Sequence, residues 1–128
     1  MLRVMLVEDS KLLAERVREA LDQLPDVEVV GTTDTEGGAV AMARASKADA
    51  MILDLQLRVG TGFGVLRTLG KQRPAVVVLT NFSLPAYAER ARELGVEQFL
   101  DKGKDFERLP AAIAWITSNL SSRTTPSG

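Results

Sequence analysis

Short apolar runs alternate with amphipathic segments along almost the whole chain, and this alternation constrains the possible folds more than any other feature. The runs are rich in β-branched and aliphatic residues, which is typical of strands, and they cover residues 2–7, 27–31, 50–55, 75–80 and 97–101. Apolar residues at helical spacing predict helices over 11–24, 35–47, 63–70, 84–94 and from near 109 to 120. Strictly alternating strands and helices predict a parallel sheet with helices on both faces.

The polarity of the individual runs predicts the order of the strands. Three runs are almost entirely apolar, as central strands of a parallel sheet should be: 2–7, 50–55 and 75–80. The other two runs carry charged or amide side chains, which suit the edges of a sheet: Glu28, Glu97 and Gln98. These features favour an α/β fold of the flavodoxin-like (βα)5 type, a three-layer sandwich with a five-stranded parallel sheet in the order 2-1-3-4-5.

Capping residues mark several helix boundaries. Ser10 is a candidate N-cap of the first helix. Ser83 is a candidate cap of the fourth helix, which has Pro85 in its first turn and stops at Gly95. Pro110 indicates that the regular part of the last helix starts just before it.

The chain has 128 residues, which fits a single domain. We expect the domain to cover residues 1–120 and the segment 121–128, "SSRTTPSG", to be a flexible tail or the start of a linker. No apolar run is long enough to span a bilayer and no secretion signal is recognisable, so we expect a cytoplasmic protein without a membrane partner. The net charge of -1 predicts no direct binding of nucleic acid by this segment.

The chain contains no cysteine and no histidine. Disulfides, thiolate chemistry, zinc–histidine sites and Ser-His-Asp catalysis are therefore excluded. Any chemistry must come from carboxylates, hydroxyls, lysines, arginines and the backbone.

Polar residues stand at the carboxyl ends of four of the five predicted strands. In sheets of this kind the ligand crevice lies outside those ends. The residues that gather there are Glu8 and Asp9 after the first run, Asp54 in the third, Thr80 in the fourth, and Asp101 with Lys102 at the fifth. Any one of these residues alone has an ordinary structural explanation, such as a helix cap or a turn, but their agreement at one rim favours a functional site.

The first and third strands are neighbours in the predicted order, so Glu8, Asp9 and Asp54 should lie close together. Three crowded carboxylates repel one another, and a cation relieves that repulsion. All the ligands on offer are oxygens, which fit a hard divalent ion, Mg²⁺ first among them. Lys102 supplies a further positive charge.

The chain resembles a response-regulator receiver domain of two-component signalling, in the CheY-like superfamily. The matching pieces are "LVEDS" (6–10), "ILDLQL" (52–57) with Gly62, "VVVLTN" (76–81) and "FLDK" (99–102). The resemblance covers about residues 1–120, and each motif falls at the strand end where the family needs it.

The resemblance implies a set of roles for the site residues. Asp54 would accept a phosphoryl group from a phosphohistidine of a sensor histidine kinase or a histidine phosphotransfer protein. Mg²⁺ would be held by Asp9, Asp54, the backbone carbonyl of Gln56 and, directly or through water, Glu8. The remaining roles concern the bound phosphoryl group and the switch: Thr80 and Lys102 would hold the phosphoryl oxygens, and Thr80 with Phe99 would form the switch.

The resemblance also implies a signalling module and not an enzyme with its own substrate. Self-catalysed phosphotransfer and slow autodephosphorylation are expected. A downstream target or a second copy of the chain would read the state through the face formed by 84–94, 97–101 and 109–120. Trp115 lies off the apolar stripe of the last helix and is expected to be partly exposed, either as a rim residue or as an anchor for a partner.

The sequence departs from the common family pattern at four positions. The acidic pair is Glu8-Asp9 where two aspartates are commoner, so the longer Glu8 side chain would reach the metal through water. Arg58 stands where proline is usual after the phosphoacceptor, which predicts a less rigid loop. Gly103 follows Lys102 in place of the common proline, and Asn81 replaces the small residue that often follows the hydroxyl residue.

Two other classes of protein stay open at this point. A haloacid-dehalogenase-type hydrolase also uses an aspartyl phosphate, but it would want an acid two residues after the nucleophile, where this chain has Gln56. A degenerate receiver that only docks partners would have lost Asp54, Thr80 or Lys102, and all three are present.

Overall fold

The structure is a computed structural model that describes the backbone of residues 1–124 and the side chains of residues 1–120. The five strands are β1 (Leu2–Val7), β2 (Val27–Thr33), β3 (Ala50–Leu53), β4 (Ala75–Thr80) and β5 (Gln98–Asp101). The helices are α1 (Lys11–Asp22), α2 (Glu36–Ala45), α3 (Gly62–Leu69), α4 (Pro85–Glu93) and α5 (Leu109–Thr124), with a 3-10 turn, η1 (Phe106–Arg108), before α5.

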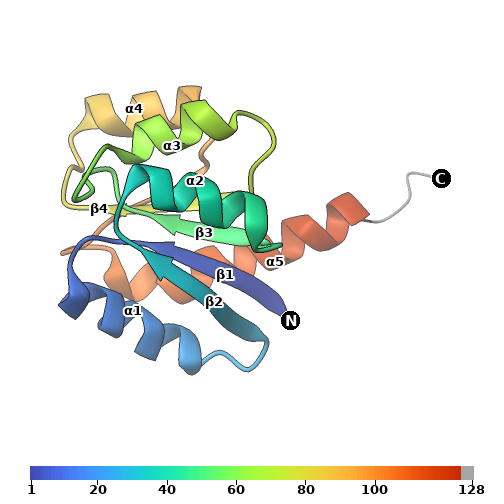
Figure 1. Ribbon diagram of the computed structural model, residues 1–128. Coiled ribbons are helices and arrows are strands. Elements are labelled where there is room, and N and C mark those ends of the chain that lie inside the picture. Colours follow the sequence, from blue (N-terminus) through green and yellow to red (C-terminus); the bar gives the residue numbers. More distant parts are fainter. Residues whose placement is uncertain (125–128) are drawn as a thin grey trace.

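All the strands pair in parallel, in the order β2-β1-β3-β4-β5, which confirms the predicted sheet. Helices α1 and α5 cover one face of the sheet, and α2, α3 and α4 cover the other (Figure 1). The two runs with charged or amide side chains form the edge strands, as predicted. Because the strands are parallel, all five carboxyl ends meet at one edge of the sheet.

The apolar side chains of the central strands divide between two cores, one on each face. Leu6, Ile52 and Leu79 pack with α1 and α5, whereas their chain neighbours Met5, Met51 and Val78 pack with the helices on the other face. This alternation follows from the two-residue period of a strand. It also explains why these runs are almost entirely apolar: both faces of each central strand are buried.

Two of the predicted helix starts have different outcomes. The Ser10 side chain accepts a hydrogen bond from the Leu13 N–H and caps α1, as predicted. The prediction for Ser83 is wrong: Leu84 is the N-cap residue of α4, and α4 has no side-chain cap bond. The Ser83 side chain lies close to Asp101 instead.

The C-terminal helix begins at Leu109, close to the predicted start, and Pro110 lies in its first turn, where a missing N–H costs nothing. The backbone of α5 includes residues 121–124, the first half of the predicted tail, and 125–128 lie outside the described residues. Trp115 is 39% exposed, as expected from its place off the apolar stripe. No helix in the described part of the chain is long and apolar enough to cross a membrane.

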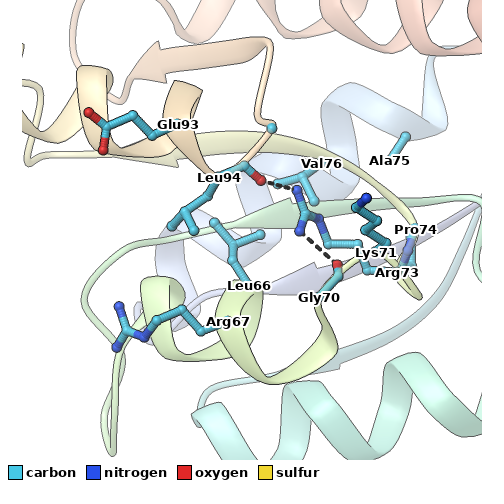
Figure 2. A pocket seen from close by; sticks show the side chains of 11 residues that line it. Leu66, Arg67, Gly70, Lys71, Arg73, Pro74, Ala75, Val76, Glu93 and Leu94 are labelled. Atoms are coloured by element: carbon cyan, nitrogen blue, oxygen red, sulfur yellow. Dashed lines mark hydrogen bonds between the residues drawn. The ribbon is translucent and has the colours of Figure 1, made fainter.

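A cavity of about 620 Å³ lies at the opposite edge of the sheet, between the C-terminal ends of α3 and α4 (Figure 2). Arg73 extends across it and donates to the Gly70 carbonyl at 2.8 Å and to the Leu94 carbonyl. Gly70 and Leu94 are the C-cap residues of α3 and α4, so one guanidinium group links the ends of two helices. This cavity is remote from the carboxyl ends of the strands.

Candidate acidic site at the carboxyl ends of the strands

Three acidic residues meet where β1 and β3 end. Glu8 and Asp9 follow β1 directly, and Asp54 follows β3, whose last residue, Leu53, pairs with Val7. One carboxylate oxygen from each of the three acids can be chosen so that all lie within 4.8 Å of one another. The neighbouring strands thus bring the acids together as the predicted strand order requires.

The polar residues at this edge are unusually buried. Within residues 1–120, the buried polar or charged side chains are Glu8 and Asp54, each 4% exposed, and Thr80, fully buried. All three are residues that the sequence assigned to the site. Burying a carboxylate costs free energy that a packed apolar residue would not, so this arrangement is hard to explain by stability alone.

Lys102 supplies the counter-charge inside the cluster. Its ammonium nitrogen lies 2.9 Å from Glu8 Oε1 and 2.8 Å from Asp54 Oδ2, and the Lys102 side chain is only 10% exposed. Burial alone would lower the pKa of Lys102, but its hydrogen bonds to Asp54 and Glu8 raise that pKa above its ordinary value. Lys102 is therefore a cation held between two carboxylates.

One ammonium group does not balance the acids. Burial, opposed by hydrogen bonds from the Ser10 N–H and from Lys102, raises the pKa of Glu8 to about 7. The negative charge of Asp54 contributes in the same direction. A carboxylate with such a pKa lacks sufficient positive charge around it, and the oxygen-only donor set with its excess negative charge fits a hard divalent cation.

Thr80 joins this cluster to the loop that leads into α4. Its carbonyl accepts a hydrogen bond of 3.0 Å from the Lys102 N–H, so the backbones of the two residues are linked. Its hydroxyl oxygen accepts a hydrogen bond of 3.1 Å from the Phe82 N–H. A change at the Thr80 hydroxyl would therefore reach Phe82 directly.

Asp101 is not part of the group of three acids and organises its own loop. Its Oδ1 accepts hydrogen bonds of 2.8 Å from the N–H groups of Gly103 and Lys104. The nearby Ser83 hydroxyl, followed by these backbone bonds, lowers the pKa of Asp101. The loops after β4 and β5 thus come close together at Ser83 and Asp101.

Phe99 lies on β5 and is half-buried between the sheet and α4. It lines a groove of about 440 Å³, together with Pro85, Ala88, Glu89 and Arg92 of α4 and with Val96 and Glu97. The groove provides space beside the Phe99 ring. The structure thus places the predicted switch residue at the face formed by α4 and β5.

The loop after Asp54 begins with close backbone contacts. The Gln56 N–H donates to Asp54 Oδ1 at 3.3 Å, and Gln56 forms an isolated antiparallel bridge with Thr61. Gly62 packs so closely that a Cβ atom there would overlap the Asp54 carbonyl oxygen. This explains why Gly62 accompanies the "ILDLQL" motif: only a residue without a side chain lets α3 start beside Asp54.

Sequence reasoning missed two acids that contact this loop, Asp34 and Glu36. Asp34 Oδ2 lies 2.8 Å from Nε of Arg58, the residue that stands where the family often has proline. Glu36 Oε1 accepts a hydrogen bond of 3.0 Å from the Thr61 N–H. The loop has no proline, but it is restrained by contacts with a segment more than twenty residues earlier, for which the sequence pattern carried no signal.

A profile of the family described as response regulator receiver domain matches residues 4–114. The chain therefore belongs to the response regulator receiver family, and it is a receiver domain of the two-component type. This result sets aside the hydrolase alternative. The sheet order and the acidic strand ends agree with it.

Two similar proteins are longer than this chain. The chain is 30% identical over 113 residues to the transcriptional regulatory protein DesR of Bacillus subtilis, covering 88% of this chain and 57% of DesR. It is 31% identical over 122 residues to a protein-glutamate methylesterase/protein-glutamine glutaminase of Caulobacter vibrioides, covering 93% of this chain and 36% of that protein. The chain thus spans about half of the first relative and about a third of the second.

Solved structures show the same fold. The two-component response regulator of the LuxR family from an Aurantimonas species superimposes with a TM-score of 0.85 at 26% identity, covering 91% of this chain and 85% of that one. The shared architecture is the five-stranded parallel sheet with helices on both faces.

Proposed function

We propose that Asp54 is the phosphoacceptor of this receiver domain and that a phosphohistidine of a sensor kinase or phosphotransfer protein is the donor. The observation that carries this proposal is a buried Asp54 carboxylate with the Lys102 ammonium at 2.8 Å and two further acids beside it. A carboxylate oxygen of Asp54 attacks phosphorus as the phosphorus–nitrogen bond of the donor breaks. The electron pair of that bond stays on the imidazole, and an acyl phosphate forms on Asp54.

Glu8, Asp9, Asp54 and the backbone carbonyl of Gln56 would hold Mg²⁺. When bound, Mg²⁺ offsets the negative charge of the acids and of the transferred group. The support for this ligand set is the short separation of the three acids and the raised pKa of Glu8, about 7. Glu8 already bonds the Ser10 N–H and Lys102, so it is suited to reach the metal through water.

Lys102 and Thr80 would hold the phosphoryl oxygens once the group is transferred. Lys102 already donates to Asp54, so its amine can shift to an oxygen of the new group without leaving the site. Thr80 can turn its hydroxyl hydrogen toward another oxygen while it still accepts from the Phe82 N–H. Water attack on phosphorus then releases inorganic phosphate and restores Asp54, which is the slow autodephosphorylation expected of the module.

The output would be a change of the face formed by α4, β5 and α5, with Thr80 and Phe99 as the switch. DesR is a transcriptional regulatory protein and the Caulobacter relative is a methylesterase, so related chains of this kind occur in proteins with different outputs. We infer that the phosphorylated state of residues 1–120 is read by a target protein, a linked domain or a second copy of the chain. We also infer that this exchange takes place in the cytoplasm, without nucleic acid contacts by this segment.

The test is incubation of the protein with a small-molecule acyl phosphate and Mg²⁺, followed by intact mass and peptide mapping. We expect the mass of one phosphoryl group on Asp54 in the parent and none in Asp54→Asn. The matched control is Asp26→Asn, an exposed acid at the other edge of the sheet, which should label like the parent.

Three outcomes would contradict the proposal. Equal labelling of Asp54→Asn would remove the assignment of Asp54. Repeated turnover of a phosphate ester would favour a hydrolase, and no labelling at all would favour a docking module.

A further inference from the structure

The loop after Asp54 is paired with the segment between β2 and α2. The Glu36 N–H donates to the Val59 carbonyl at 2.9 Å, and the Arg58 N–H donates to the Asp34 carbonyl at 3.0 Å. Thr35 and Val59 form an isolated parallel bridge between these two hydrogen bonds. Residues 34–36 therefore act as a short extra strand beside residues 58–59.

The Glu36 side chain adds a contact at the start of α3. Its Oε1 accepts a hydrogen bond of 3.0 Å from the Thr61 N–H. A Cβ atom at Gly64 or Gly60 would overlap the Glu36 side chain, so both glycines leave room for it. Gly60 also has a φ of 85°, which a side chain would disfavour.

A second side-chain contact lies at the other end of the same pairing. The Arg58 guanidinium forms two hydrogen bonds with the Asp34 carboxylate, at 2.8 Å and 3.4 Å. Both side chains are largely exposed, so this ion pair alone contributes little to stability. It does, however, join the same two residues as the backbone bond from the Arg58 N–H to the Asp34 carbonyl, so it reinforces that end of the pairing.

These contacts lead to Gln56 in two steps. Glu36 holds the Thr61 N–H, and Thr61 is bridged to Gln56, two residues after Asp54. The Gly62 N–H donates to the Leu55 carbonyl at 2.9 Å, which closes the same turn from the other side. The position of the Gln56 backbone therefore depends on where Thr61 is held.

We propose that Glu36 is a positioning residue for the phosphorylation site: through Thr61 it sets the place of the Gln56 carbonyl, and the Asp34–Arg58 pair supports the same loop. This inference rests on the proposed function, in which that carbonyl is a ligand of Mg²⁺. Glu36 itself touches neither the metal nor the phosphoryl group. Groups that orient metal ligands typically change metal affinity by about ten- to a hundredfold when removed.

The test compares Glu36→Ala and Glu36→Gln with the parent, and uses Glu19→Ala, an exposed acid on α1, as the control. Backbone amide exchange is measured without metal, and Mg²⁺ is then titrated while the amide shifts of Asp54 and Gln56 are followed. In Glu36→Ala we expect faster exchange at Thr61 and an Mg²⁺ midpoint raised about tenfold. Glu36→Gln keeps an acceptor oxygen, so it should recover most of both effects, and Glu19→Ala should change neither.

The Asp34–Arg58 contribution is tested by exchanging the charges. Asp34→Arg alone should speed exchange at the Arg58 N–H, and adding Arg58→Asp should restore it. A double variant that exchanges as fast as the single one would overturn the contribution of the pair.

Failure of the inference and failure of the proposed function give different results. If Glu36→Ala lowers the melting temperature but leaves the Mg²⁺ midpoint within about twofold of the parent, Glu36 is only structural and the inference is overturned. If amide exchange at Thr61 is unchanged in Glu36→Ala, Glu36 does not hold the Thr61 N–H, and this part of the inference is overturned whatever the Mg²⁺ titration shows. If the parent itself shows no Mg²⁺-dependent shift at Asp54, the proposed function fails, and the metal part of the inference fails with it.

Discussion

At the residue scale, the site depends on one ammonium group placed between two buried carboxylates. Lys102 lies within 3 Å of both Glu8 and Asp54, at 2.9 Å and 2.8 Å. Removing one partner of a buried charge pair leaves the other group uncompensated, which costs more than the pair itself contributes. Glu8 and Asp54 would therefore depend strongly on Lys102 when no metal is bound.

Lys102→Met should destabilise the metal-free protein by about 3 kcal/mol at pH 8. The loss should be smaller at pH 5. The pKa of Glu8 is about 7 with Lys102 present, and removing Lys102 raises it further, so at pH 5 Glu8 is protonated and leaves no uncompensated charge. Urea unfolding at both pH values in the presence of a chelator measures this difference. Lys104→Met, at an exposed lysine two residues later, is the control, and an equal loss at both pH values would contradict the argument.

The raised pKa of Glu8 predicts an unusual pH dependence of stability. The folded state holds a proton on Glu8 up to about pH 7, whereas the unfolded state loses it near 4.5. The free energy of unfolding should therefore fall as pH rises from about 4.5 to about 7, by at most about 3 kcal/mol from this group. The chain has no histidine, so no other side chain ordinarily titrates between pH 5 and 7.

The measurement is the melting temperature against pH in the presence of a chelator, with Glu8→Gln as the comparison. The variant should lose the fall between pH 4.5 and 7. Asp34, Glu89 and Asp101 have lowered pKa values, so their contributions are lost only as pH falls below the ordinary range of a carboxyl group. A parent curve that rises through this window would show that Glu8 is not held protonated.

At the element scale, the strands and their polar ends could be predicted from the sequence, but the contacts between loops could not. Strand signals are local: an apolar run followed by a polar residue such as Asp54 or Lys102 indicates, within a few residues, where a strand ends at the site. The contact between Glu36 and Thr61 joins positions 25 residues apart and depends on how α2 meets α3. Ser83 shows the same limit, because its hydroxyl lies close to Asp101 on the neighbouring loop, which no local capping pattern indicates.

Arg73 is the element-scale counterpart of Lys102, because it joins two helices at their C-terminal ends (Figure 2). Free carbonyls at a helix C-terminus carry partial negative charge, which a guanidinium group offsets. Arg73→Met should lower the free energy of unfolding by about 1–2 kcal/mol, since two carbonyls lose a charged donor. Arg67→Met, at an exposed residue that lines the same cavity, should change stability little in the same urea titration, and an equal effect of both variants would contradict the role of Arg73.

At the scale of the whole molecule, the route from the site to the α4–β5 face runs along β4. Thr80 ends this strand, and its hydroxyl oxygen holds the Phe82 N–H at 3.1 Å. Helix α4, which begins a few residues later, has no side-chain cap at its N-terminus, whereas the carbonyl of its C-cap residue Leu94 is held by Arg73. A pull on the loop after Thr80 would therefore move the N-terminal end of α4 more than its C-terminal end.

Thr80→Ala should separate binding of the phosphoryl group from transmission to this face. Beryllofluoride with Mg²⁺ mimics the aspartyl phosphate, and amide chemical shifts report where the protein responds. In the parent we expect shifts at Glu8, Asp9 and Asp54 and also along 84–101, because the Thr80 hydroxyl draws the loop inward and Phe99 rotates into the space behind it. Thr80→Ala keeps the acids and Lys102, so it should still bind beryllofluoride and retain the shifts at the acids.

The same variant should lose most of the shifts along 84–101, because alanine can neither donate to the bound group nor accept from the Phe82 N–H. Thr117→Ala on α5 is the matched control, since Thr117 lines a cavity with residues 24–27 at the amino end of β2, away from the acids, and the variant should respond like the parent. If Thr80→Ala showed the full pattern along 84–101, the signal would reach α4 by another route, such as the contact between Ser83 and Asp101. Because that contact joins the loops after β4 and β5 without involving the Thr80 hydroxyl, Ser83→Ala in the Thr80→Ala background would then remove the remaining shifts.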